Sequence, residues 1–382
     1  MALRYTLFWI LRRLSRIADG NASPLAAVRF AFAAICLTAW AGTPARGVER
    51  VEFVDRRDRP QDVQGEIMVE ARDGGLLLLG EDGRMWTIQP EQIRDRQSDD
   101  RPLVAVDEAE AARRLLAEMP SGFEIYRTNH YVIGHNTNER YVAWVGSLFE
   151  RLHRGFYTYW KNQGWQLQPA RFPLVGLVFA DRESFVQYAR PELGDAVNGI
   201  IGYYNLETNR ITTFNMPNAE RNVATIIHEA MHQLAYNSGL QRRFADNPLW
   251  VSEGLAVFFE APDFSTPRGW RTIGRVNTVN LRRFQKFLPS RPADSLTTLI
   301  RDDARFRSAD TATAAYSEAW ALNYFLLKTR RKEYVEYLQQ LSRGEPLEQC
   351  GPRERLQMFE AAMGTDLASL EKEFLPFITR LR

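Results

Sequence analysis

The sequence predicts an α+β fold in which a small all-β module precedes a mixed sheet, one buried helix and a helical C-terminal half. Three observations predict it: short apolar runs separated by Asp-Gly pairs near the N-terminus, a continuous apolar run followed by a hairpin pattern, and helical periodicity from about Asn280 onward. The 382 residues are 45% hydrophobic, which allows a sizeable core. The expected parts are an N-terminal segment (1–41), a β-barrel-like module (48–96) and a larger domain (105–382) with a sheet part (105–262) and a helical part (280–382).

The first 41 residues have the composition of a targeting segment. Five arginines precede an apolar run from Phe30 to Ala41, and Ala39-Trp40-Ala41 offers a small-x-small cleavage site. This layout is typical of a secretory signal peptide, and the apolar run is too short for a typical membrane span. We expect an exported protein, periplasmic or extracellular in a bacterium, with an uncleaved N-terminal anchor as the alternative.

Charge and cysteine content argue against several classes of protein. Residues 1–41 hold five Arg and one Asp, so their removal takes the formal net charge from +2 to −2. The remaining chain has no basic excess for nucleic-acid binding, and no membrane contact is expected beyond the N-terminal segment. Removal also leaves Cys350 as the one remaining cysteine, so no intrachain disulfide is expected. The sequence leaves the oligomeric state open.

Residues 48–96 are typical of a small β-barrel or meander. Apolar and β-branched residues mark four strands, and Asp73-Gly74 and Asp82-Gly83 mark hairpin turns between them. The sequence does not separate a folding appendage, which we favour, from a wall- or protein-binding unit. The expected strands cover residues 51–54, 65–70, 76–80 and 84–88.

The sheet part follows a charged stretch at residues 99–101. Its central run, residues 173–179, is continuously apolar, as expected for a strand buried on both faces. His130 and His135 flank the first hairpin on opposite faces and are expected at the surface, whereas His153 is expected to pack within a helix. The expected elements are helices at 107–119, 139–160 and 181–188, strands at 123–126, 131–134 and 173–179, and a second hairpin at 199–204 and 210–214.

The helical part follows a loop at residues 263–269 that contains Pro and Gly. We expect this part to form the far wall of a cleft, with the functional site between the two parts. The expected helices cover residues 281–287, 311–329, 332–341, 352–363 and 367–378.

A helix between Asn218 and Gly239 is expected to connect the second hairpin to the rest of the chain. Apolar residues recur at helical spacing from Val223 to Leu234. Asn218 suits the N-cap position, and Gly239 suits the C-terminal stop. The pattern therefore predicts a buried amphipathic helix.

His228 and His232 lie four residues apart in this helix and therefore project from one face. Neutral imidazoles at this spacing bind Zn²⁺ well, and Glu229, about 100° round the helix, can reach a water bound to that ion. The alternative is a chance pair of histidines beside a solvated glutamate, but unpaired polar side chains within an apolar helix are costly. The pattern therefore predicts a metal site.

A catalytic zinc site needs a third protein ligand and an open position for water. Glu253 is the one carboxylate within the apolar run at residues 250–259. A glutamate inside an apolar helix is rarely buried unless it is paired or bound to metal. The alternative is that Glu253 begins a helix, where its charge favours the N-terminus. We expect Glu253 to be the third ligand.

His-Glu-x-x-His at 228–232, followed by Trp-x-x-Glu-Gly-x-Ala at 250–256, resembles the gluzincin metallopeptidases. The chain more closely resembles the peptidase-MA-like group of secreted bacterial gluzincins, over roughly residues 120–380. The resemblance implies that the two histidines and the distal glutamate of these motifs bind zinc.

One position departs from the pattern of this family. Several gluzincin families carry an acid four residues after the glutamate ligand, where it orients a zinc-bound histidine. This chain has Val257 at that position. Glu260, further along the same helical face, is one substitute, and an acid elsewhere in the chain is another.

The zinc motif and Glu229 together predict a zinc-dependent hydrolase. A zinc ion lowers the pKa of bound water and polarises a carbonyl, while Glu229 serves as general base and then as general acid. Tyr316 is the candidate for a second donor beside the metal, with structural packing as the alternative. We expect a peptidase that acts on a peptide or protein substrate, although a non-peptide amide is also compatible. The alternative is a catalytically inactive zinc-containing protein that binds a partner or acts in the cell envelope.

The resemblance also implies where a substrate binds. In gluzincins an extended peptide commonly lies antiparallel along an exposed sheet edge near the active-site helix. The candidate edge here is the first strand of the 199–214 hairpin, where Gly202 leaves room for a backbone partner beside Tyr203 and Tyr204. The alternative is an internal hairpin whose tyrosine rings lie in the core.

Overall fold

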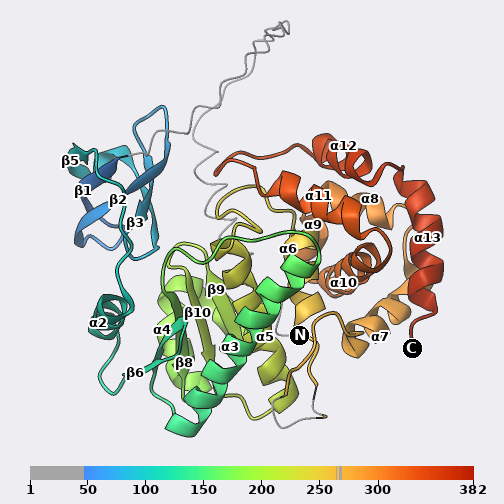
Figure 1. Ribbon diagram of the computed structural model, residues 1–382, viewed down its shortest axis with the longest axis horizontal. Coiled ribbons are helices and arrows are strands. Elements are labelled where there is room, and N and C mark those ends of the chain that lie inside the picture. The colour runs from blue at the N-terminus through green and yellow to red at the C-terminus, as the bar shows by residue number, and fades with distance from the viewer. Residues whose placement is uncertain (1–46, 264, 266–268) are drawn as a thin grey trace, which may run out of the picture. The chain divides into compact units, whose positions relative to one another are not determined.

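The computed structural model describes residues 47–263, 265 and 269–382. The signal peptide or anchor expected at residues 1–41 lies outside this range. The described chain forms two compact units, a larger one comprising Glu81–Trp86 and Ala105–Arg382 and a smaller one comprising 47–80 and Thr87–Val104. The α+β prediction is confirmed, because a small antiparallel sheet, a mixed sheet and a largely helical C-terminal half follow one another along the chain (Figure 1).

The smaller unit is built on a five-stranded antiparallel sheet of order β4-β3-β2-β1-β5. Its apolar side chains, including Val51, Leu78 and Ile88, are fully buried. The fifth strand was not predicted, because its sequence is charged after Ile93 and most of its side chains are exposed. Backbone pairing to β1 and the Arg96–Glu49 ion pair at 2.7 Å hold it in place. The strands are β1 (Val48–Val54), β2 (Pro60–Glu70), β3 (Leu76–Gly80), β4 (Met85–Ile88) and β5 (Ile93–Asp99), with a 3₁₀ turn η1 (Pro90–Gln92) before β5.

The larger unit contains a mixed sheet of order β6-β7-β8-β10-β9. The three middle strands run parallel, and an antiparallel strand closes each end. Every residue of the central strand β8 is buried, as its continuous apolar sequence predicts. The strands are β6 (Glu124–Arg127), β7 (Tyr131–His135), β8 (Leu174–Phe179), β9 (Gly202–Asn205) and β10 (Arg210–Phe214).

Helices cover both faces of this sheet. On one face, Leu115 of α2 and Phe185 of α4 join a cluster with alternate strand residues such as Leu177. On the other face, α3 and α5 pack against each other and against the sheet, and the Phe149 ring lies over Gly176. This alternation follows from the two-residue period of a strand. The helices are α2 (Glu108–Glu118), α3 (Glu139–Asn162), α4 (Arg182–Leu193) with the 3₁₀ turn η2 (Gly194–Gly199), and α5 (Ala219–Asn237).

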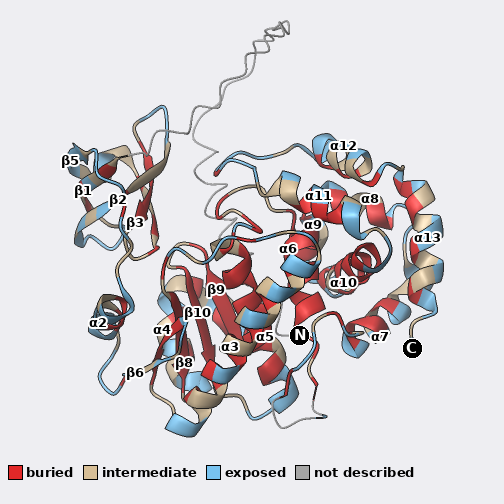
Figure 2. Ribbon diagram, viewed as in Figure 1, coloured by how far each residue is buried: buried red, intermediate tan, exposed pale blue. Residues whose placement is uncertain are grey.

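The C-terminal half is organised around α10, which contacts α6, α7, α9, α11 and α13. Figure 2 shows α10 and α6 as largely buried, unlike the outer helices. Helices α8 and α9 are too short to show a helical period in the sequence. The elements are α6 (Leu249–Phe259), α7 (Thr278–Phe287), η3 (Leu288–Ser290), α8 (Ser295–Arg301), α9 (Ala304–Arg307), α10 (Ala312–Thr329), α11 (Arg331–Leu341), α12 (Pro352–Met363) and α13 (Leu367–Thr379). Within the described ranges, no helix is long and apolar enough to cross a membrane.

Helices α6 and α10 approach each other closely at Gly254. A Cβ atom added there would lie 2.1 Å from Asn323 Nδ2 and 2.7 Å from the carbonyl oxygen of Ala319. Asn323 Nδ2 in turn donates to the carbonyl of Trp250 at 2.9 Å. Only glycine fits this contact, which fixes α6 against the core of the helical half.

Candidate metal centre

Helix α5 has the ends that its sequence predicts. The Asn218 side chain accepts a hydrogen bond from the backbone N–H of Arg221 at 2.9 Å and so caps the N-terminus. The helix ends at Asn237, and Gly239 follows with a φ of +78°, a left-handed conformation that glycine adopts without strain. His228 and His232 therefore lie in its rigid middle, more than two turns from the N-terminus.

Glu253 lies in the second turn of α6, and the first turn of this helix contains no acidic residue. The structure therefore does not support the alternative in which Glu253 serves as a helix-starting charge. The carboxylate is 1% exposed, and α6 packs against α5. Glu253 thus points from one buried helix toward the histidines of another.

His228, His232 and Glu253 converge on a single point, and we call these three residues the metal group. The two Nε2 atoms of the histidines lie 3.2 Å apart. Glu253 Oε2 lies 3.2 Å from His228 Nε2, and Glu253 Oε1 lies 3.7 Å from His232 Nε2. Ligands at about 2.0–2.1 Å from a tetrahedral zinc ion are separated by about 3.3 Å. These three separations therefore suit one small divalent ion.

The surroundings of Glu253 fit a bound cation. Its Oε1 atom is buried and has no hydrogen-bond partner among the described residues. Burial alone would raise the pKa of Glu253, but the charge of His232 and the hydrogen bond from His228 hold that pKa well below its usual range. A buried carboxylate with an unpaired oxygen is costly unless a cation satisfies it. The donor set of two imidazoles and one carboxylate is one that zinc accepts.

Glu260 fixes the orientation of His228. Its Oε2 atom accepts from His228 Nδ1 at 2.7 Å, and its Oε1 atom accepts from Asn277 Nδ2 at 3.2 Å. A proton on Nδ1 leaves the Nε2 lone pair for a metal, which is the usual arrangement around metal-bound histidines. The sequence left open whether Glu260 or an acid elsewhere in the chain replaces the acid that related families carry at the Val257 position. In the structure Glu260 makes this contact with His228.

Glu229 lies beside the metal group and is held by the sheet. Its Oε2 atom accepts from the backbone N–H of Tyr204 at 2.8 Å. Burial raises the pKa of Glu229, although the charges of His228 and His232 oppose that rise. This role of Tyr204 could not be predicted from the sequence, because the donor is a backbone group and the side chain carries no information about it.

The sequence left two alternatives open for β9: an edge strand that binds substrate, or part of an internal hairpin whose tyrosine rings lie in the core. The structure shows one feature of each. It lies at the end of the sheet, with β10 as its one strand neighbour in the described part of the chain. The rings of Tyr203 and Tyr204 are nonetheless buried, at 2% and 4% exposure, so they do not flank an open groove. Tyr204 Oη donates to Asn209 Oδ1 at 2.7 Å, and its ring stacks on Tyr236 of α5.

Tyr316 of α10 lies near the metal group. Burial, followed by the negative charge of Glu253, raises the pKa of Tyr316 well above its ordinary value. Its ring also packs edge-on against Phe306, with centroids 5.3 Å apart. The tyrosine therefore has both the location predicted for a donor and the packing predicted as the alternative.

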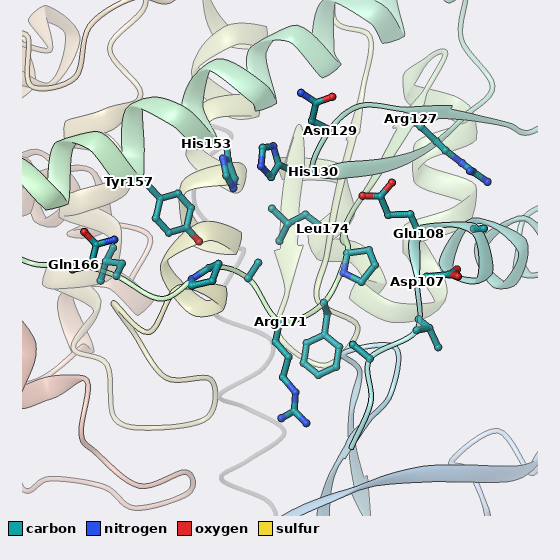
Figure 3. A pocket seen from close by; sticks show the side chains of 18 residues that line it. Asp107, Glu108, Arg127, Asn129, His130, His153, Tyr157, Gln166, Arg171 and Leu174 are labelled. Atoms are coloured by element: carbon teal, nitrogen blue, oxygen red, sulfur yellow. The ribbon is translucent and has the colours of Figure 1, made fainter. Parts of the chain in front are cut away.

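The metal group and Glu229 are less accessible than the expected cleft implies. All four side chains are 1–2% exposed. A cavity of about 1020 Å³ in the larger unit lies elsewhere, between α2, α3 and the segment before β8, and none of these four residues lines it (Figure 3).

His135 is buried, contrary to its expected surface location, and its ring nitrogen Nδ1 pairs with the carbonyl of Thr137 at 3.1 Å.

Residues 222–348 match the family model described as a protein of unknown function, DUF1570. The chain is similar to this family over that range. The range contains the metal group, Glu229, Glu260 and Tyr316, but not the sheet. A comparison with the curated proteins found no match. The family match therefore assigns no activity.

Proposed function

We propose that this chain is a zinc-dependent hydrolase, and most simply a peptidase of the gluzincin type. The observation that carries the proposal is the convergence of His228 Nε2, His232 Nε2 and a Glu253 carboxylate oxygen within 4.8 Å of one another, with Glu229 on the same helix. Three protein ligands leave a fourth position open, as catalytic zinc sites do, whereas structural sites are closed by four.

The three members of the metal group would hold the ion, with Glu260 orienting His228. A zinc ion bound there supplies a Lewis acid for the substrate carbonyl and lowers the pKa of its bound water. Zinc suits the donor set better than calcium or magnesium, because those ions prefer oxygen ligands alone.

Glu229 is the residue proposed to move the proton. Its raised pKa brings it closer to that of an effective general base, and the hydrogen bond from the Tyr204 N–H holds its carboxylate in place. In the proposed reaction the carboxylate accepts a proton from the attacking water and then donates it to the leaving amine. General-base catalysis of this kind contributes about 10²–10⁴-fold to the rate.

Tyr316 is proposed as a neutral donor toward the substrate oxygen. Its raised pKa keeps the phenol protonated at neutral pH, and a protonated phenol can donate a hydrogen bond to developing negative charge. We further propose a peptide or protein as the substrate and an exported location, both of which rest on the sequence alone.

The 1–2% exposure of the metal group supports a second candidate, a zinc-containing protein without catalytic activity. Metal analysis combined with hydrolysis of a mixed peptide library, read by mass spectrometry, distinguishes the two. The hydrolase proposal expects about one zinc per chain, its loss in His232→Ala, and cleavage that falls at least about 100-fold in Glu229→Gln while zinc is retained. Glu220→Gln, an exposed change in the first turn of the same helix, is the matched control. Zinc without cleavage would favour the second candidate, and no zinc would overturn both.

A further inference from the structure

Asn277 is the residue immediately before α7, and it is 4% exposed. Its Oδ1 atom accepts a hydrogen bond from the backbone N–H of Asn280 at 3.1 Å and so caps the N-terminus of α7. A backbone N–H can only donate, so this cap fixes which end of the amide faces the helix. The Nδ2 group is therefore left to interact elsewhere.

The Nδ2 group of Asn277 interacts with the end of α6. It donates to Glu260 Oε1 at 3.2 Å and to the carbonyl oxygen of Val257 at 3.4 Å. An ionised carboxylate only accepts hydrogen bonds, so the amide orientation that caps α7 is also the one that suits Glu260. One buried amide thus joins the start of α7 to the end of α6.

Glu260 needs such a partner because it is the C-cap residue of α6, where the regular helix ends. The residue is buried, and its two oxygens have different partners. Oε2 accepts from His228 Nδ1 at 2.7 Å, whereas Asn277 is the one hydrogen-bond donor to Oε1 among the described residues. Without this amide, Oε1 would be a buried acceptor without a protein donor, which costs free energy and favours rotation of the carboxylate away from His228.

We propose that Asn277 is a positioning residue of the metal centre, because its amide holds Glu260 and Glu260 in turn orients the imidazole of His228. This inference rests on the proposed function, since it takes His228 to be a zinc ligand. Within the described part of the chain, the Asn277 side chain makes no hydrogen bond to the metal group or to Glu229, so it acts through Glu260. Hydrogen bonds behind a metal-bound histidine fix its ring and so affect metal affinity.

Asn277→Ser tests the proposal, because a serine hydroxyl can still cap α7 but lacks the amide that holds Glu260. The zinc affinity of the full-length protein is measured by competition with a zinc-binding dye. It is expected to fall about 3–10-fold, less than the loss of about 10–100-fold that follows removal of a direct partner of a metal-bound histidine. Asn138→Ser is the matched control, because Asn138 caps α3 in the same way, accepting from the Tyr141 N–H at 2.9 Å. It should leave the affinity unchanged.

Arg282→Gly separates positioning from the stability of α7. Arg282 is exposed in the middle of this helix, so glycine there weakens the helix without removing the Asn277 amide. The zinc affinity is expected to stay at the wild-type value. A loss as large as that of Asn277→Ser would overturn the proposal, and so would wild-type affinity in Asn277→Ser.

A second measurement needs no metal. In the zinc-free protein, the His228 Nδ1–H proton is followed by NMR, identified by its absence in His228→Gln, and it is expected to exchange faster with water in Asn277→Ser. Absence of zinc from the wild-type protein would overturn the proposed function, whereas an unchanged exchange rate would overturn the role of Asn277. If Asn277→Ser does not fold, Asn277→Asp, which keeps the capping oxygen and lacks the amide donor, takes its place in both measurements.

Discussion

Asp303 Oδ1 accepts a hydrogen bond from the backbone N–H of Leu249 at 3.0 Å and so caps the N-terminus of α6, the helix that carries Glu253. Pro248, the residue before the helix, makes no side-chain cap of its own. Arg355 of α12 donates to the same Asp303 oxygen at 3.0 Å and also pairs with Asp246. The position of Glu253, a candidate metal ligand, therefore depends on residues far along the chain.

Replacing Asp303 by Ala is expected to lower the free energy of unfolding of the larger unit by about 2–4 kcal/mol, because it removes a helix cap and one buried partner of Arg355. The measurement is urea unfolding followed by fluorescence. Asp310→Ala, an exposed change nearby, is expected to have little effect and serves as the control. Equal stability of the two variants would contradict the capping role.

Replacing Glu260 by Gln is expected to weaken zinc binding by about 10–100-fold, because His228 loses the charged acceptor that fixes its Nδ1 proton. Competition with a zinc-binding dye measures the affinity. Glu220→Gln removes a charge from the exposed start of α5 and should leave the affinity unchanged. The same affinity in both variants would show that Glu260 does not orient the ligand.

Replacing Gly254 by Ala is expected to destabilise the larger unit by about 1–3 kcal/mol, the usual cost of forcing extra atoms into a packed core. The new methyl group meets Asn323 Nδ2, whose hydrogen bonds to α6 and α10 would be lost or displaced. Thermal unfolding measures the effect. Gly351→Ala adds a methyl group where no atom lies within 4 Å, and a comparable loss there would argue against the packing explanation.

Glu118 is expected to make the larger unit lose stability in acid. Burial opposes its ionisation, but hydrogen bonds from Arg210, at 2.7 and 3.2 Å, lower the pKa of Glu118 below its ordinary value. The unfolded chain therefore takes up a proton at a higher pH than the folded chain does. The stabilisation is fully present above the ordinary glutamate pKa and is lost as the pH falls through the lowered folded value.

The Glu118→Gln variant should flatten this acid dependence, because its side chain no longer titrates. Urea unfolding over a series of pH values below about 5 measures the slope for both proteins. Glu108→Gln, an exposed change on the same helix, is expected to keep the wild-type slope. A wild-type slope in Glu118→Gln would assign the acid sensitivity to other groups.

The parts of the fold that show strong periodicity could be predicted from the sequence. Helix α5 and the central strand β8 were found because their buried faces carry continuous apolar patterns. Strand β5 was missed because charged residues follow Ile93 and its place depends on backbone pairing with β1. Two short helices, α8 and α9, span too few turns for a period to appear.

The candidate site was predictable where one helix brings its residues together. The spacing of His228 and His232 indicates a common face before any tertiary structure is known. Glu253 required the added argument that a carboxylate in an apolar helix needs a partner. The hydrogen bond from the Tyr204 N–H to Glu229 and the Asp303 cap of α6 could not be predicted from local sequence. Each joins residues that are far apart in the chain.

The ion pairs of Arg355 also set a limit on how the chain can be divided. A fragment confined to residues 222–348, the range of the family match, would contain Asp246 and Asp303 but not the arginine that lies between them. It would also lack every strand of the mixed sheet, including the backbone N–H that holds Glu229. Such a fragment would carry the three candidate metal ligands, but the buried Asp303 and the partly buried Asp246 would both lose Arg355. We therefore expect that residues 222–348 alone do not form a folded protein with this site.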